Sequence, residues 1–160
     1  MKQLLILLIT LSTLILAGCE NGKKDMTPPE ILPVGDYASP QNCQEFHCGG
    51  VLPFAYAFTD DTELGSFNLE IHTNHDHHTH STEAEDCPEH EGEEHEDAEP
   101  VNPWVFNKSY AIPAGKTVYE ADLKIPIPAD IDPGEYHFMI RVTDAAGWQQ
   151  LRSVSIHIEE

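Results

Sequence analysis

Hydrophobic and polar positions alternate with a period of two in short segments from residue 28 onward. In residues 65–72, Phe67, Leu69 and Ile71 share one face of an extended strand, and polar side chains occupy the other. Pro, Gly and Asp residues separate the segments, which together predict an all-β antiparallel β-sandwich. The predicted strands are 28–34, 51–60, 65–72, 117–126, 135–143 and 151–159, with 104–111 as an additional candidate.

Residues 130–147 refine the expected fold. A Pro-Gly turn, a tyrosine opening a strand and an Asp-Ala-Ala-Gly turn resemble the penultimate strand of bacterial immunoglobulin-like domains. Tyr136 is expected at the tyrosine corner of such a domain, with its hydroxyl bonded to upstream backbone. His137 and His157 fall within strands, where we expect solvent-facing or hydrogen-bonded side chains without a metal role.

The N-terminal residues have the pattern of a targeting signal. Lys2 precedes an apolar run over residues 4–16, and such a segment is excluded from the fold. Residues 16–19, Leu-Ala-Gly-Cys, resemble the lipobox of bacterial lipoproteins, which implies lipidation of Cys19. We expect an extracytoplasmic protein anchored to a bacterial membrane, at its outer-membrane, periplasmic or surface face; a plain secretory signal or a transmembrane anchor is the alternative. The expected division is 1–18 signal peptide, 19–27 lipidated tether and 28–160 β-sandwich domain.

The charge balance narrows the class of partner. The formal net charge is -20, and phosphate backbones need a basic surface, so nucleic acid is excluded as a partner and cations are favoured. In an oxidising compartment the cysteines after residue 19 are expected to form a disulfide. Cys43 bonds to Cys48, or either bonds to Cys87; a cysteine-histidine metal site that includes His47 is the less favoured alternative.

A long insertion over residues 72–100 contains seven of the ten histidines and many carboxylates. A segment so charged and so poor in large apolar groups cannot bury itself. In an immunoglobulin topology the connections after 28–34, 65–72 and 117–126 meet at one pole. The insertion is therefore expected beside residues 43–48.

Imidazole is a good ligand for Zn, Cu and Ni, and zinc usually takes four ligands. Side chains two apart in a strand point the same way, so closely spaced histidines can act as pincers. A solvated His-rich loop that binds metal loosely or not at all is the alternative. The candidate metal ligands are His72, His75, Asp76, His77, His78, His80, Cys87, His90 and His95.

The opposite pole has an acidic feature of its own. Asp60, Asp61 and Glu63 are expected to approach Asp144 where two turns converge. Converging carboxylates can bind calcium, but Asp also stabilises turns by side-chain to backbone hydrogen bonds. No repeated Asp-x-Asp pattern supports a site, so turn formation is the favoured interpretation.

The chain as a whole resembles a family of uncharacterised Ig-like lipoproteins from Gram-negative gut bacteria. The resemblance rests on residues 52–72, 76–83 and 127–151. It implies the immunoglobulin-like fold and the lipid anchor, and it implies no established activity.

Catalysis has little support, because the sequence has no Gly-x-Ser-x-Gly elbow, no phosphate-binding glycine loop and no His-Glu-x-x-His motif. We therefore expect a non-enzymatic protein that captures or buffers a transition-metal ion, with zinc favoured. The alternative is an adhesion or interaction module that recognises a glycan or a protein through Trp104, Trp148 and Tyr110.

Overall fold

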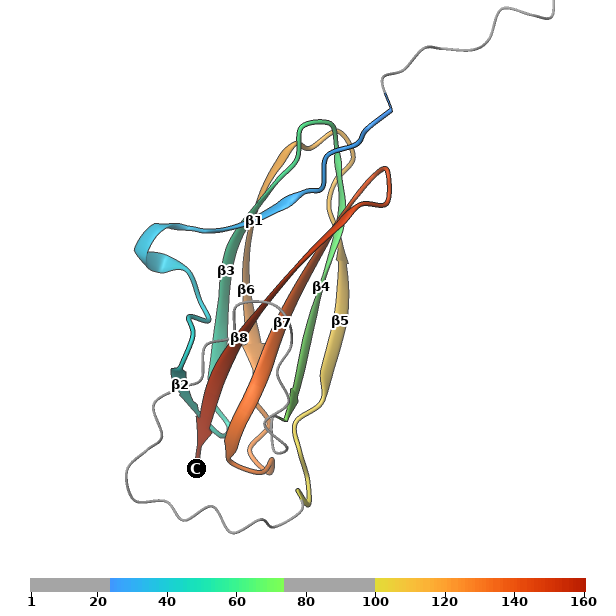
Figure 1. Cartoon of the computed structure of the whole chain (residues 1–160). Helices are drawn as coiled ribbons and strands as arrows, with labels where there is room; N and C mark the ends of the chain where they lie inside the picture. The colour runs from blue at the N-terminus through green and yellow to red at the C-terminus, as the bar shows by residue number, and fades with distance from the viewer. Residues whose placement is uncertain (1–23, 74–99) are drawn as a thin grey trace, which may run out of the picture.

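The computed structural model describes residues 24–73 and 100–160, which form two packed β-sheets (Figure 1). One sheet has the order β1-β3-β6 and the other β2-β8-β7-β4-β5. Every predicted strand is present, and the all-β sandwich is confirmed. The elements are β1 (Glu30–Pro33), the 3-10 helix η1 (Gly35–Tyr37), β2 (Gln44–His47), β3 (Val51–Thr59), β4 (Leu64–Thr73), β5 (Phe106–Ala111), β6 (Val118–Pro126), β7 (Gly134–Asp144) and β8 (Gln149–Glu159).

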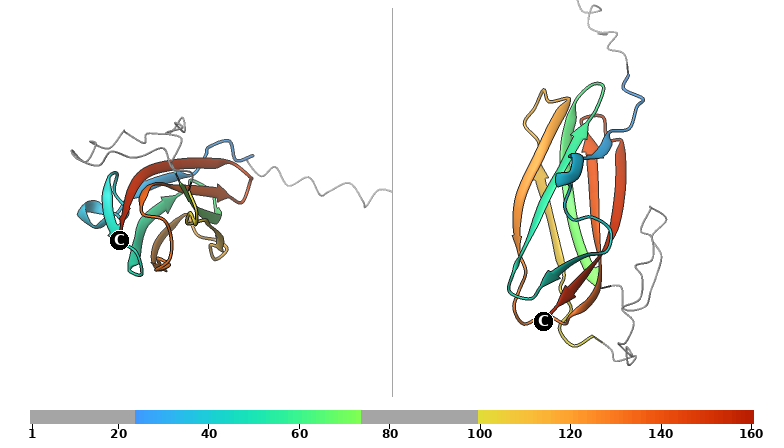
Figure 2. Two further views of the ribbon diagram at one scale, coloured as in Figure 1. Left: turned by 90° about the horizontal axis from the view of Figure 1, so that it is seen from below. Right: turned by 90° about the vertical axis from the view of Figure 1, so that its left-hand side faces the viewer.

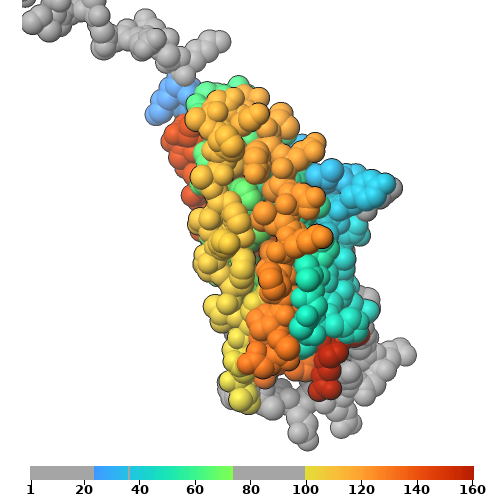
Figure 3. Space-filling view, turned by 180° about the vertical axis from the view of Figure 1, so that it is seen from behind, coloured from blue at the N-terminus to red at the C-terminus, as the bar shows by residue number. Residues whose placement is uncertain are grey.

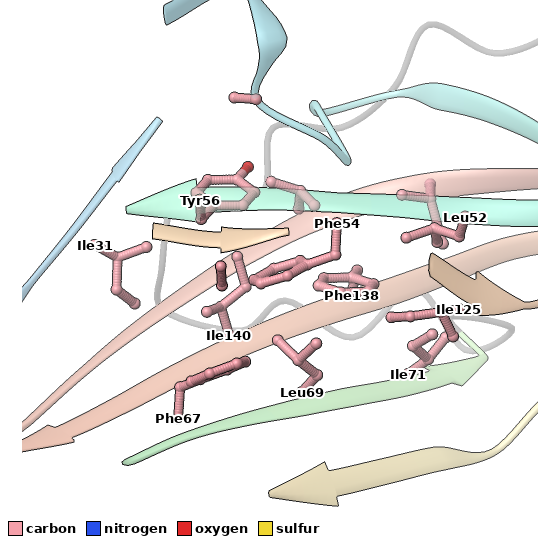
Figure 4. Close-up of a cluster of buried hydrophobic side chains, with 14 of the residues drawn as sticks. Ile31, Leu52, Phe54, Tyr56, Phe67, Leu69, Ile71, Ile125, Phe138 and Ile140 are labelled. Carbon is pink, nitrogen blue, oxygen red and sulfur yellow. The ribbon is translucent and has the colours of Figure 1, made fainter. Parts of the chain in front are cut away.

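The hydrophobic core fills the space between the two layers, which Figure 2 shows edge-on with β7 and β8 opposite β3 and β6. The period-two pattern places every second side chain there, because alternate residues of a strand face opposite sides of the sheet. Phe54 lies at the centre of the core (Figure 4), with its ring 5.8 Å from that of Phe138 on the facing sheet. Tyr56, Phe67, Leu69, Ile71, Ile125 and Ile140 are buried around it.

The outer face of the three-stranded sheet is open to solvent. Figure 3 views this side, with β6 between β3 and β5. Glu120, Asp122 and Lys124 project from β6 at alternating exposed positions. The opposite face of β6 points inward and buries Ala121 and Ile125, so β6 alternates as strictly as β4 although it pairs only with β3.

One strand was not predicted from the sequence. β2 pairs in parallel with β8, from Gln44 opposite Ile156 to His47 opposite Glu159. It is flanked by two long-range backbone hydrogen bonds, Cys43 N to Ser155 O at 2.8 Å and Cys48 N to Glu159 O at 2.8 Å. The segment carries only one buried apolar side chain, so its pairing comes from β8 and not from a local period.

The two ends of the sandwich differ in composition. We call the end formed by residues 47–50, 70–73, 127–137 and 157–160 the histidine pole, and the end formed by residues 25–27, 60–64, 113–117 and 144–148 the turn pole. β4 ends and β7 begins at the histidine pole, where Thr73 pairs with Tyr136 (Figure 1). The connections after β1 and β6 reach this pole, and β4 ends there, so the expected gathering of these three chain positions at one end is present.

Tyr136 makes the expected bond to upstream backbone. Its hydroxyl donates to Asp132 O at 2.6 Å and accepts from Trp104 N at 3.1 Å. Burial raises the pKa of the Tyr136 hydroxyl, and the hydrogen bond from Trp104 partly opposes this shift. The bonds fix the loop before β7 to the segment that enters β5.

Candidate metal sites at the two poles

The histidine pole brings two imidazoles into contact at the base of the insertion. His72 on β4 pairs with His137 on β7, and their ring centroids are 5.6 Å apart in an edge-to-face arrangement. Glu70 Oε1 lies 3.6 Å from His72 Nδ1. Of the candidate transition-metal ligands, His72 alone lies within the described residues. Its ring contacts the imidazole of His137.

Two further histidines lie at the same pole, each next to a carboxylate. His157 Nδ1 is 3.2 Å from Glu135 Oε1, and His47 Nδ1 is 3.2 Å from Glu159 Oε2. His47 is exposed, whereas His157 is 8 % and His137 only 2 % exposed. The expectation of hydrogen bonding thus holds for His157, but neither strand histidine faces solvent. Once Thr73 is paired with Tyr136, the antiparallel register of β4 and β7 places His72 opposite His137.

The other candidate ligands, His75, Asp76, His77, His78, His80, Cys87, His90 and His95, lie outside the described residues. Within residues 24–73 and 100–160, the histidine pole has no three potential ligand atoms close enough to share an ion. His72 and His137 alone are short of a four-ligand zinc site. Any complete site at this pole therefore needs ligands from the insertion.

Cys48 corrects part of the cysteine prediction. It is a free thiol, so bonds from Cys48 to Cys43 or Cys87 are excluded. Cys43 and Cys48 flank the extended β2, which separates them by about 15 Å, and a disulfide requires Cα atoms within about 7 Å. Burial, together with the charge of Glu160, raises the pKa of the Cys48 thiol, while a backbone hydrogen bond lowers it. Cys48 Sγ lies 3.7 Å from Ile131 O.

The turn pole gathers three carboxylates from two distant segments. One oxygen each of Asp25, Asp60 and Asp61 lies within 4.8 Å of the others. Thr27 Oγ1 donates to Asp61 Oδ2 at 3.1 Å, and Thr27 N donates to Asp25 Oδ1 at 3.1 Å. The segment before β1 is thereby fixed against the β3–β4 turn.

The predicted acidic set is only partly brought together. Asp60 Oδ1 accepts from Thr62 N and Glu63 N, which is ordinary turn chemistry. The Glu63 carboxylate instead accepts from Gly115 N at 2.7 Å, and Asp144 Oδ1 accepts from Gly147 N and Trp148 N in the β7–β8 turn. Asp25 lies in the segment expected to be a tether, residues 19–27, and no local pattern signals its contact with residues 60–61.

The fold defines the class of this protein as a two-sheet β-sandwich. A family model described as "Domain of unknown function (DUF4625)" matches residues 17–159, and the chain belongs to that family. No curated protein matches the chain. Among solved structures, the crystal structure of Spo0M, sporulation control protein, from Bacillus subtilis is similar, with 11 % identity and a TM-score of 0.42 over 84 % of this chain and 51 % of that chain. The present chain thus spans about half the length of that protein.

In the part of the chain that the structure describes, no helix has the length and apolar character needed to cross a bilayer.

Proposed function

We propose that this protein is a lipid-anchored, extracytoplasmic, immunoglobulin-like domain that captures or buffers a transition-metal ion, zinc first, through its His-rich insertion. The observation that carries the proposal is the contact of His72 with His137 at the point where β4 leads into the insertion. Six of the ten histidines follow within residues 75–95, and the remaining four lie at the histidine pole. The four described imidazoles therefore lie at one end of the sandwich, at the point where the His-rich insertion leaves β4.

Carboxylates lie beside three imidazoles of the histidine pole, an arrangement that is common around metal sites. Glu70, Glu135 and Glu159 each lie within 3.6 Å of a histidine nitrogen. In metal sites such carboxylates orient the rings and raise their basicity. Protons compete with a metal ion for imidazole nitrogen, so the affinity is expected to fall with falling pH.

A titration by calorimetry tests the proposal. Residues 20–160, which include every described residue, are expected to bind Zn, Cu or Ni with micromolar or tighter affinity at pH 7.5 and more weakly at pH 6, because protonated imidazole is not a ligand. Changing His75, His77, His78 and His80 together to Ala is expected to abolish the tight binding. Glu120→Ala is the control, since Glu120 is exposed in the middle of β6 and away from the histidine pole, and it should leave binding intact. No heat with any of the three ions would contradict the proposal.

A disulfide between Cys43 and Cys87 is proposed as part of the same arrangement. Cys48 is free, so this is the pair that remains of those considered. The bond would tie the insertion to the residue that precedes β2. Peptide mapping without reduction is expected to recover a cross-linked pair containing Cys43 and Cys87, with Cys48 alkylated; recovery of alkylated Cys43 would exclude it.

An interaction module is the second candidate, and its aromatic surface is smaller than the sequence predicted. Trp104 is 4 % exposed and packs against Tyr136, and Tyr110 stacks on Phe67 with ring centroids 4.8 Å apart. Tyr110 is half-buried, and Trp148 is 40 % exposed. A recognition face built on these three residues would therefore depend mainly on Trp148.

A further inference from the structure

The turn pole carries a second cluster of potential ligands, made of oxygen atoms alone. Oxygens of Asp25, Asp60 and Asp61 lie within 4.8 Å of one another. Calcium binds oxygen at about 2.3–2.6 Å, so ligands on opposite sides of one ion are about 5 Å apart. The three carboxylates already stand at the spacing that a shared calcium ion requires.

Two of these carboxylates hold buried oxygens that the protein leaves without a hydrogen bond. Asp25 Oδ2 and Asp60 Oδ2 are both shielded from solvent and have no hydrogen-bond partner among the described residues. A buried, unpaired carboxylate oxygen is costly, and the cost rises when a second negative group lies beside it. Their other oxygens already accept backbone hydrogen bonds, so the turn chemistry is satisfied without Oδ2.

Asp144 adds an independent observation at the same pole. It is 4 % exposed, and its Oδ2 also lacks a hydrogen-bond partner within the described part of the chain. Asp144 pairs with Leu64, directly after the β3–β4 turn, and Trp148 links the two regions by donating its indole N–H to Asp25 O at 3.2 Å. The turn pole therefore holds a third buried carboxylate oxygen that no donor among the described residues balances.

We propose that Asp25, Asp60 and Asp61 bind a calcium ion, and Asp144 adds a further negative charge at the same pole. Oxygen-only ligands favour a hard cation over zinc or copper. Calcium tolerates the irregular geometry of ligands from separate loops, whereas magnesium demands a near-ideal octahedron.

The site would fasten the segment before β1 to the sandwich. Asp25 belongs to that segment, while Asp60 and Asp61 belong to the β3–β4 turn. The ion therefore joins the part of the chain that leads to Cys19 to the rigid domain. This inference uses the opposite pole from the histidines and does not depend on transition-metal binding.

Thermal unfolding with and without calcium tests the inference on residues 20–160. With a dissociation constant in the range of extracellular calcium modules, 5 mM CaCl2 is expected to raise the Tm by about 3–8 °C. Asp25→Asn and Asp60→Asn should each remove most of this rise, because the amide keeps the Oδ1 acceptor and loses the charge. Terbium luminescence excited through Trp148, which contacts Asp25, should appear in the parent protein and be lost in Asp25→Asn.

The controls separate a specific site from general charge screening. Asp122→Asn removes one charge from the exposed face of β6 and should retain the full calcium-dependent rise in Tm. Asp25 lies outside both sheets, so Asp25→Asn tests the site even if Asp60→Asn fails to fold. An unchanged Tm with calcium, an equal rise in all three variants, or an equal rise with 5 mM MgCl2 would overturn the calcium assignment.

Discussion

Replacing Phe54 by alanine is expected to lower the free energy of unfolding by about 3–5 kcal/mol, the largest effect of any single change considered for this protein. Phe54 is fully buried, and its ring stacks on those of Tyr56 at 5.4 Å, Phe138 at 5.8 Å and Phe67 at 6.0 Å (Figure 4). Truncation removes contacts with both sheets and leaves a cavity where they meet. Urea denaturation followed by circular dichroism measures the loss.

Phe54→Leu and Val118→Ala are the matched controls for that measurement. Leucine keeps most of the buried volume, so Phe54→Leu should cost clearly less than Phe54→Ala. Val118 is 57 % exposed, and its truncation should change stability by no more than about 0.5 kcal/mol. A loss below about 1 kcal/mol for Phe54→Ala would contradict the packing described between the two sheets.

Tyr136→Phe is expected to lower the free energy of unfolding by about 2–3 kcal/mol without creating a cavity. The change removes the bond to Asp132 O and leaves the buried Trp104 N without its acceptor, and an orphaned buried donor costs about 1–3 kcal/mol. Tyr37→Phe is the control, because Tyr37 is 84 % exposed. Equal stabilities for the two variants and the parent would show that the corner does not stabilise the fold.

The pH dependence of this effect has a definite sign. Burial raises the pKa of Tyr136 above the ordinary value of 10.0, so the folded state holds the proton more tightly than the unfolded chain. The associated stability is fully present below pH 10 and is lost as pH rises through the raised pKa. The difference between the parent and Tyr136→Phe should therefore shrink between pH 9 and pH 12 in the same urea experiment.

The strands that alternate cleanly could be predicted from the sequence because their burial is one-sided. In β4, Phe67, Leu69 and Ile71 are all buried, as the period-two pattern requires. β2 does not follow from such a pattern, since Phe46 is its one buried residue and its register is set by backbone bonds to β8. A strand whose register is set by pairing with another strand need not show an alternating hydrophobic pattern in its own residues.

In the candidate sites, too, some features are visible in the sequence and others depend on contacts that only the fold creates. The density of histidines after β4 was visible in the sequence, but the contact of His72 with His137 depends on the cross-strand register between β4 and β7. The cluster at the turn pole was visible only at residues 60 and 61, because Asp25 reaches it from 35 residues upstream. Local periodicity carries no information about contacts between segments that are distant in the sequence.

The opposite placement of the two poles sets how the molecule would stand on a surface. The N-terminal segment meets the domain at the turn pole, and β7, with eleven residues, spans about 35 Å from there to the histidine pole. In the proposed lipid-anchored form, the four described imidazoles of the histidine pole would lie at the distal tip, well clear of the lipid headgroups. An ion taken up there would be presented outward, toward whatever approaches from the aqueous side.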